Sequence, residues 1–149
     1  MCSASGMSKD SEYPVIAMLK EIQTTRPNFE WVGIYILRGD TLELGPYLGA
    51  ATEHTKILVG QGVCGTAVAQ GKNMLVEDVR LLDNYIACSA SVRSEIVVLI
   101  WHEGEIVGQI DADCDAVGGF NSEDETYLTQ VAEQIAPVVV QWAAEGWQE

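Results

Sequence analysis

Basic residues are scarce in this chain of 149 residues. Eight lysines and arginines stand against 22 aspartates and glutamates, which gives a formal net charge of −14. A surface of that charge repels both the phosphates of nucleic acids and the anionic face of a cytoplasmic membrane. The composition therefore predicts no nucleic-acid partner and no membrane partner.

Long hydrophobic runs are also missing. The longest apolar run, 96–101, is far shorter than the roughly 20 residues that span a bilayer. No basic segment followed by an apolar stretch, the pattern that directs export, is present near the start. We therefore expect a cytoplasmic protein. Its composition, 48% hydrophobic and 20% charged, is typical of a chain that folds around its own core.

Cysteine is sparse, with four residues and no Cys-x-x-Cys pair. Without an export signal, reactive reduced thiols are a better expectation than disulfides, although a buried cysteine can also serve as a small hydrophobe. Cys64 lies near the predicted start of a helix, where backbone N–H groups favour a thiolate, and Cys88 lies in a loop of small residues. No metal is expected. A mixed metal site is a weaker alternative, and its ligands would be Cys64, Cys88, Cys114 and His54.

The hydrophobic periods predict an α+β fold, with one domain over 11–149 after a flexible tail over 1–10. Apolar residues recur at helical spacing over 13–26 and along a last helix over 121–144. A short helix is predicted over 62–70, ending near Gly71. The predicted strands cover 31–37, 41–48, 56–59, 93–101 and 105–113, and the segment 74–91 is expected to be irregular apart from a short apolar run over 74–76. Because several of these strands follow one another through tight turns, we expect an antiparallel sheet covered by helices.

Three acidic residues interrupt strands that are otherwise apolar. Asp111 and Asp113 share one face of their strand, and repulsion between them should raise the pKa of at least one. Glu95 is the only charged residue in an apolar run, and burial would require a partner or a raised pKa. The alternative is a solvent-facing strand end for the two aspartates and an edge strand for Glu95. If the aspartates are buried, we expect a cation or a proton between them.

Two aromatic residues flank a glycine on the first strand. Trp31, Gly33 and Tyr35 share one face, and the middle position has no side chain. A gap between two rings would hold a small ligand group. Ordinary packing of aromatic residues in the core is the alternative.

Five short segments together resemble one known family. They are Trp31-Val32-Gly33-Ile34-Tyr35, Gly62-Val63-Cys64-Gly65-Thr66-Ala67, Ile86-Ala87-Cys88, Ser94-Glu95-Ile96-Val97 and Asp111-Ala112-Asp113. In order and spacing, these segments resemble the free methionine-(R)-sulfoxide reductase family of the GAF-domain superfamily. The resemblance runs from about Trp31 to the last helix. It implies a GAF-like fold, in which helices flank a six-stranded antiparallel sheet.

The resemblance implies that the chain reduces free L-methionine-(R)-sulfoxide to L-methionine. It makes Cys88 the nucleophile, which becomes a sulfenic acid, and Cys64 the resolving thiol, which then forms a disulfide with Cys88. Thioredoxin or a similar dithiol would reduce that disulfide, with no metal or organic cofactor. The implied substrate-binding residues are Trp31, Tyr35, Glu95, Asp111 and Asp113. Homodimers are frequent in this family, so a homodimer is a further expectation.

One departure from the family pattern and two rival functions remain. His54 stands where the family usually has a further recycling cysteine, which makes Cys114 a candidate auxiliary thiol. Most GAF domains are sensors, so a non-catalytic module that binds a small molecule is the main alternative. A thiol-based redox sensor is the other alternative, and it would leave the acidic residues without a role.

Overall fold

The structure, a computed structural model, describes residues 4–82 and 91–148, with side chains described from residue 14 onward. Six strands form one sheet in the order β3-β2-β1-β6-β5-β4, and every neighbouring pair is antiparallel. The strands are β1 (Trp31–Arg38), β2 (Thr41–Leu48), β3 (Lys56–Leu58), β4 (Met74–Val76), β5 (Ser94–His102) and β6 (Glu105–Cys114). The α+β prediction is confirmed, and the five predicted strands coincide with β1, β2, β3, β5 and β6 within one residue. Strand β4 lies at the short apolar run over 74–76, in a segment that was expected to be irregular.

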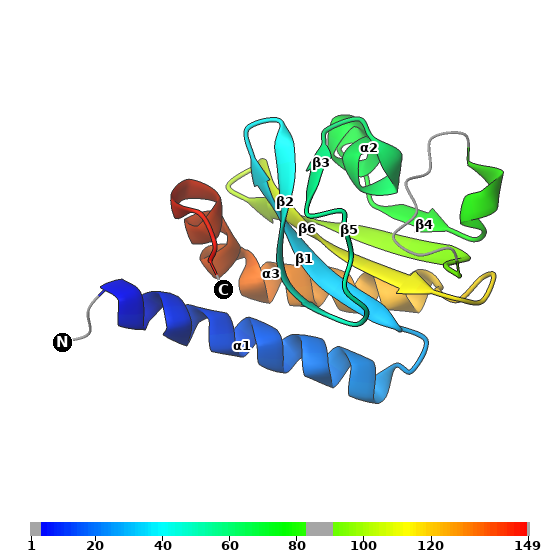
Figure 1. The fold of residues 1–149 in the computed structure, drawn as a ribbon, viewed down its shortest axis with the longest axis horizontal. Coiled ribbons are helices and arrows are strands. Elements are labelled where there is room, and N and C mark those ends of the chain that lie inside the picture. Colours follow the sequence, from blue (N-terminus) through cyan, green and yellow to red (C-terminus); the bar gives the residue numbers. More distant parts are fainter. Residues whose placement is uncertain (1–3, 83–90, 149) are drawn as a thin grey trace.

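Helices cover the two faces of the sheet unequally (Figure 1). The long helices α1 (Ala4–Thr25) and α3 (Ser122–Glu145) lie on one face, where they bury the larger core cluster. The short helix α2 (Gly62–Gln70) lies over the other face, and a short 3₁₀ helix (Val79–Leu81) follows β4. Because side chains alternate along a strand, each central strand contributes to both faces. The face below α2 has the smaller hydrophobic cluster, and it also holds the buried acidic residues.

Local sequence signals account for the helix ends. Asn121 begins α3 with a capping box, in which its side chain accepts the Asp124 N–H and the Asp124 carboxylate accepts the Asn121 N–H. The Asp124 carboxylate also pairs with Arg26, which ties the start of α3 to the end of α1. Helix α2 ends at Gly71, whose φ of 65° is in the left-handed region that favours glycine. Among the described residues, no helix has the length and apolar character needed to cross a bilayer.

The first helix is longer than the sequence predicts. It begins at Ala4 and passes through Pro14, whereas the periodicity predicts a start at residue 13 after an irregular tail. Residues 4–10 are therefore helical. Once a helix has formed, each residue added to its end contributes one more backbone hydrogen bond. Helix α1 therefore extends beyond the segment in which apolar residues recur at helical spacing. The boundary between tail and domain stays a prediction.

Candidate functional site

Four buried polar residues of the sheet lie in neighbouring rows on the face below α2, and they are Glu95, Gln109, Asp111 and Asp113. Strand β6 lies between β1 and β5, so each of its residues has one partner on either side. Asp113 pairs with Trp31 on β1 and with Glu95 on β5. Side chains two residues further along each strand lie on the same face and form the next row. In the next row, Asp111 pairs with Gly33 and Val97. In the row after that, Gln109 pairs with Tyr35 and Leu99.

All three acidic residues predicted from the sequence are buried. The exposed fraction is 0% for Asp111, 3% for Asp113 and 4% for Glu95, which excludes the alternative of a solvent-facing strand end. Among the described residues, no hydrogen bond reaches any of the four carboxylate oxygens of Asp111 and Asp113. Two adjacent buried carboxylates without such partners are costly as anions.

Burial shifts the titration of both aspartates in the same direction. Removal from water raises the pKa of Asp111, and the nearby Glu95 and Cys64 side chains oppose part of that rise. Burial also raises the pKa of Asp113 well above its ordinary value, and the negative charges of Asp111 and Asp115 add to the effect. The pair is therefore suited to hold a proton, or to receive a cation from outside.

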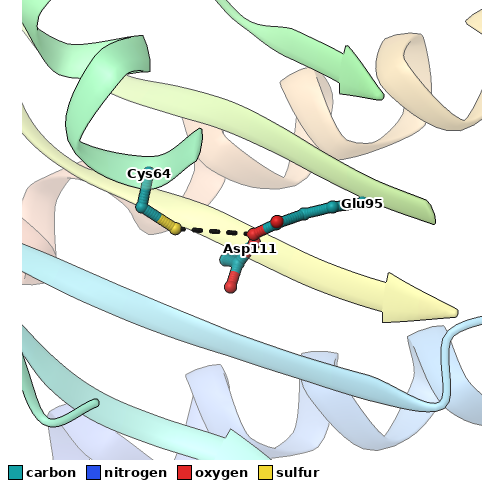
Figure 2. A group of neighbouring side chains, drawn as sticks. All are labelled: Cys64, Glu95 and Asp111. Atoms are coloured by element: carbon teal, nitrogen blue, oxygen red, sulfur yellow. Dashed lines mark hydrogen bonds between the residues drawn. The ribbon is translucent and has the colours of Figure 1, made fainter. Parts of the chain in front are cut away.

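Cys64 joins this acidic cluster from the first turn of α2. Its Sγ donates a hydrogen bond to Glu95 Oε2 at 3.6 Å, and Figure 2 shows both side chains pointing toward Asp111. The thiol is 5% exposed. Helix α2, β5 and β6 thus bring one thiol and two carboxyl groups together from distant parts of the sequence.

Gln109 is a site residue that the sequence analysis missed. Its side chain is fully buried, and its Nε2 donates to the backbone carbonyl of Cys64 at 3.1 Å. Its Oε1 has no hydrogen-bond partner among the residues that the structure describes. Gln109 lies two residues before Asp111 on the same strand face, and this spacing was the signal that could have revealed it. The contact fixes the first turn of α2 above the sheet.

The predicted gap at Gly33 is filled by the protein itself. A Cβ placed on Gly33 would lie 2.6 Å from the Trp31 ring and 2.7 Å from Tyr47 Cβ. The Trp31 ring stacks on Tyr47 with centroids 5.4 Å apart. Glycine is therefore required because the Trp31 ring lies across its own strand. Of the two alternatives at this position, the gap for a ligand was wrong, and ordinary packing of the aromatic residues is found.

Trp31 and Tyr35 have different surroundings. Trp31 Nε1 donates to the Ala50 carbonyl at 3.0 Å, and its ring lines the larger cavity described next. Tyr35 is fully buried, and its hydroxyl donates to the His54 carbonyl at 2.7 Å. Tyr35 therefore holds the segment that follows β2 in place.

A cavity of about 310 Å³ opens beside the acidic cluster. Asp113 lines this cavity. It therefore connects the buried acidic residues with a space large enough for one amino acid. The other lining residues are Glu30, Trp31, Ala50, Ala51, Thr52, Ser91, Val92 and Asp115. A second cavity of about 10 Å³ adjoins Cys64, Glu95 and His54 and has room for about one water molecule.

Cys88 and Cys114 are the other two cysteines for which the sequence predicts a role. Cys88, the predicted nucleophile, lies outside the described residues. Cys114 is described, and it belongs to the core cluster under α1 and α3, on the opposite face of the sheet from Cys64. Neither Cys64 nor Cys114 is in a disulfide. The structure therefore does not bring the candidate auxiliary thiol to the acidic cluster, nor does it form the mixed metal site that would need it.

Comparison with known proteins identifies the family. The GAF domain family model matches residues 17–140. Free methionine-R-sulfoxide reductase of Escherichia coli (strain K12) is 42% identical over 112 residues, which cover 75% of this chain and 67% of that protein. The chain belongs to the free methionine-R-sulfoxide reductase family. The resemblance inferred from the five sequence segments is thereby confirmed, and so is the prediction that the chain is an enzyme of this family.

Solved structures support the same family from the fold. The type II free methionine-R-sulfoxide reductase of Thermoplasma acidophilum superposes with a TM-score of 0.87 at 34% identity, covering 90% of this chain and 95% of that chain. The free methionine-R-sulfoxide reductase of Neisseria meningitidis, solved in complex with its substrate, gives a TM-score of 0.76 at 33% identity. That match covers 87% of this chain and 77% of the other. The reductase family thus accounts for nearly the whole described fold.

Proposed function

We propose that this chain reduces free L-methionine-(R)-sulfoxide to L-methionine with cysteine thiols. The observation that carries the proposal is the buried pair Asp111 and Asp113, whose carboxylate oxygens have no partner among the described residues. A fold that maintains such a costly arrangement has a use for it, because buried carboxylates are normally paired. The relatives named as free methionine-R-sulfoxide reductases supply the matching reaction.

The acids explain the choice of a free amino acid as substrate. The ammonium group of free methionine sulfoxide is a cation, whereas the nitrogen of a peptide-bonded methionine is a neutral amide. Asp113 lies in the wall of the 310 Å³ cavity and adjoins Asp111 and Glu95 on the sheet. An ammonium group bound there gains charge-assisted hydrogen bonds that a peptide nitrogen cannot make. Trp31, from the same wall, offers an apolar surface to the rest of the substrate.

The acids also explain how the oxygen leaves the sulfur. Attack by the Cys88 thiolate on the sulfoxide sulfur puts negative charge on the oxygen, and a carboxyl group with a raised pKa still holds a proton to donate. Burial raises the pKa of both Asp111 and Asp113, so either carboxyl meets this requirement. The bond between the oxygen and the methionine sulfur breaks, and the oxygen is transferred to the Cys88 sulfur. Methionine leaves with the electron pair of its sulfur, and Cys88 becomes a sulfenic acid.

Recycling requires a second thiol. Cys64 attacks the Cys88 sulfenic acid, which releases water and forms a disulfide between the two residues. The contact between Cys64 Sγ and Glu95 Oε2 gives the thiol proton an acceptor at 3.6 Å. Thioredoxin or a similar dithiol then reduces the disulfide through a mixed disulfide, and both cysteines return to the thiol state.

One assay tests the reaction and its specificity together. The protein is incubated with dithiothreitol and either the R or the S epimer of free methionine sulfoxide, and methionine is quantified. We expect methionine from the R epimer alone. N-acetyl-methionine-(R)-sulfoxide keeps the reacting sulfur and removes the cation, so its kcat/KM should fall roughly 10- to 150-fold, the value of one charge-assisted hydrogen bond.

Two outcomes would contradict parts of this proposal. Equal reduction of the N-acetyl compound would mean that the carboxylates do not recognise an ammonium group. Binding of free methionine sulfoxide without any reduction would instead favour a small-molecule sensor.

Asp40→Asn is the matched control, because Asp40 is exposed in the hairpin between β1 and β2, and this change should leave kcat/KM unchanged.

A further inference from the structure

One thiol and two carboxyl groups form a compact buried cluster. Ligand atoms of Cys64, Glu95 and Asp111 all lie within 4.8 Å of one another, and all three residues are buried. Figure 2 shows the three side chains converging from α2, β5 and β6. Each belongs to a different element, so the fold and not the local sequence brings them together.

The spacing is close to that of a metal coordination sphere. A tetrahedral Zn²⁺ ion with Zn–S near 2.3 Å and Zn–O near 2.0 Å requires a sulfur-to-oxygen separation of about 3.5 Å. Cys64 Sγ and Glu95 Oε2 are 3.6 Å apart. The other ligand pairs, at no more than 4.8 Å, need to close by at most about 1.5 Å to reach tetrahedral separations, a change that side-chain rotation can supply.

Asp111 supplies the second, independent observation. Its side chain is completely buried, and neither of its oxygens accepts a hydrogen bond from any described residue. A divalent cation would give both oxygens the partner that they lack. It would also offset the negative charge that Asp111 and its neighbour Asp113 place in the interior.

We propose that Cys64, Glu95 and Asp111 bind one Zn²⁺ ion. The thiolate ligand selects Zn²⁺ over Mg²⁺ and Ca²⁺, which prefer oxygen ligands alone. Three protein ligands leave a fourth position for water. The cavity of about 10 Å³ beside Cys64 and Glu95 has room for that water, and His54 also lines it. Binding displaces the thiol proton of Cys64, and any proton held by the two carboxyl groups, into solvent.

The ion would act as a reversible inhibitor. This consequence rests on the proposed function, because a Cys64 sulfur held by Zn²⁺ cannot resolve the sulfenic acid on Cys88. Zn²⁺ and the substrate ammonium would also compete for the same carboxylates. The binding itself does not depend on the reaction, so the two ideas can fail separately.

Cobalt substitution gives a direct readout of the site. Co²⁺ is added to the fully reduced full-length protein, and thiolate-to-cobalt charge transfer and tetrahedral ligand-field bands are recorded. We expect both sets of bands, and we expect Zn²⁺ to remove them by displacement. Cys64→Ser should abolish the charge-transfer band, whereas Cys114→Ser should keep it, because Cys114 lies on the opposite face of the sheet.

Carboxylate variants complete the test. Asp111→Asn and Glu95→Gln should each weaken Co²⁺ binding at least tenfold, and Asp40→Asn should leave it unchanged. Circular dichroism establishes that each variant is folded, and Cys64→Ala replaces Cys64→Ser if the latter is not. Absence of the bands in the wild type would overturn the proposal, as would an undiminished band in the folded Cys64 variant. Loss of the band in Cys88→Ser with retention in Cys64→Ser would overturn it as well.

Discussion

Replacing Asp111 by asparagine should make the protein more stable and less active at neutral pH. The side chain keeps its shape and loses its charge. Asp111 is completely buried, and its oxygens have no hydrogen-bond partner among the described residues. The ionised form is therefore costly in the folded state, and the neutral amide avoids most of that cost.

The size of the effect depends on pH because the pKa of Asp111 is raised by burial. Between its unfolded pKa, near 4, and its higher folded pKa, the folded state binds more protons than the unfolded state. The free energy of unfolding of the wild type thus falls as pH rises through this window. The slope reaches at most about 1.4 kcal/mol per pH unit for one carboxyl group, and it vanishes above the folded pKa.

The neighbouring aspartate adds to this slope. Ionised Asp111 contributes to the raised pKa of Asp113, so Asp111→Asn also lets Asp113 ionise more easily. The stability advantage of the variant should therefore grow with pH and then level off. At the same time kcat/KM should fall roughly 10- to 150-fold, because one charge-assisted contact with the substrate is lost.

Urea denaturation of the wild type and the variant, at several pH values between about 5 and 8, measures the difference. Asp40→Asn serves as the control for loss of an exposed aspartate and should show no such trend. A stability difference that stays constant over this range would refute the claim that Asp111 is buried with a raised pKa. A variant that is more stable and fully active would instead remove Asp111 from the site.

Three further substitutions test the thiols and their support. Cys88→Ser should abolish methionine formation with every reductant, because the attacking sulfur is gone, and near-normal turnover would exclude Cys88 as the nucleophile. Cys64→Ser should complete one turnover and leave a sulfenic acid on Cys88, detectable by mass spectrometry after trapping, while unchanged turnover with thioredoxin would point to another resolving thiol. Gln109→Leu removes the contact with the Cys64 carbonyl and also an unsatisfied buried oxygen, so stability should change by no more than about 1 kcal/mol. In this variant the thioredoxin-dependent kcat should fall severalfold while KM stays unchanged, because only the recycling step by Cys64 is affected. If the rate of a single turnover, which needs only Cys88, fell by the same factor, a role limited to positioning Cys64 would be contradicted.

The sequence alone determined most of the secondary structure of this protein because its signals are local, although neither the start of α1 at Ala4 nor strand β4 was predicted. Alternation of apolar residues identified the strands, and Gly71 marked the end of α2 at the residue where the structure ends it. Asn121 marked the start of α3. The placement of Asp111 and Asp113 on one face also follows from the two-residue period of a strand, whatever the rest of the fold does.

Only the tertiary structure decided what surrounds those residues. Burial of Asp111 depends on α2 covering that face of the sheet, and the contact between Cys64 and Glu95 joins residues that are 31 positions apart. No local pattern specifies such a contact, because it depends on how the sheet and helix pack. Packing also filled the space above Gly33 with the Trp31 ring, where the sequence suggested a gap. Periodicity shows which way a side chain points, but only the packed fold shows what it meets there.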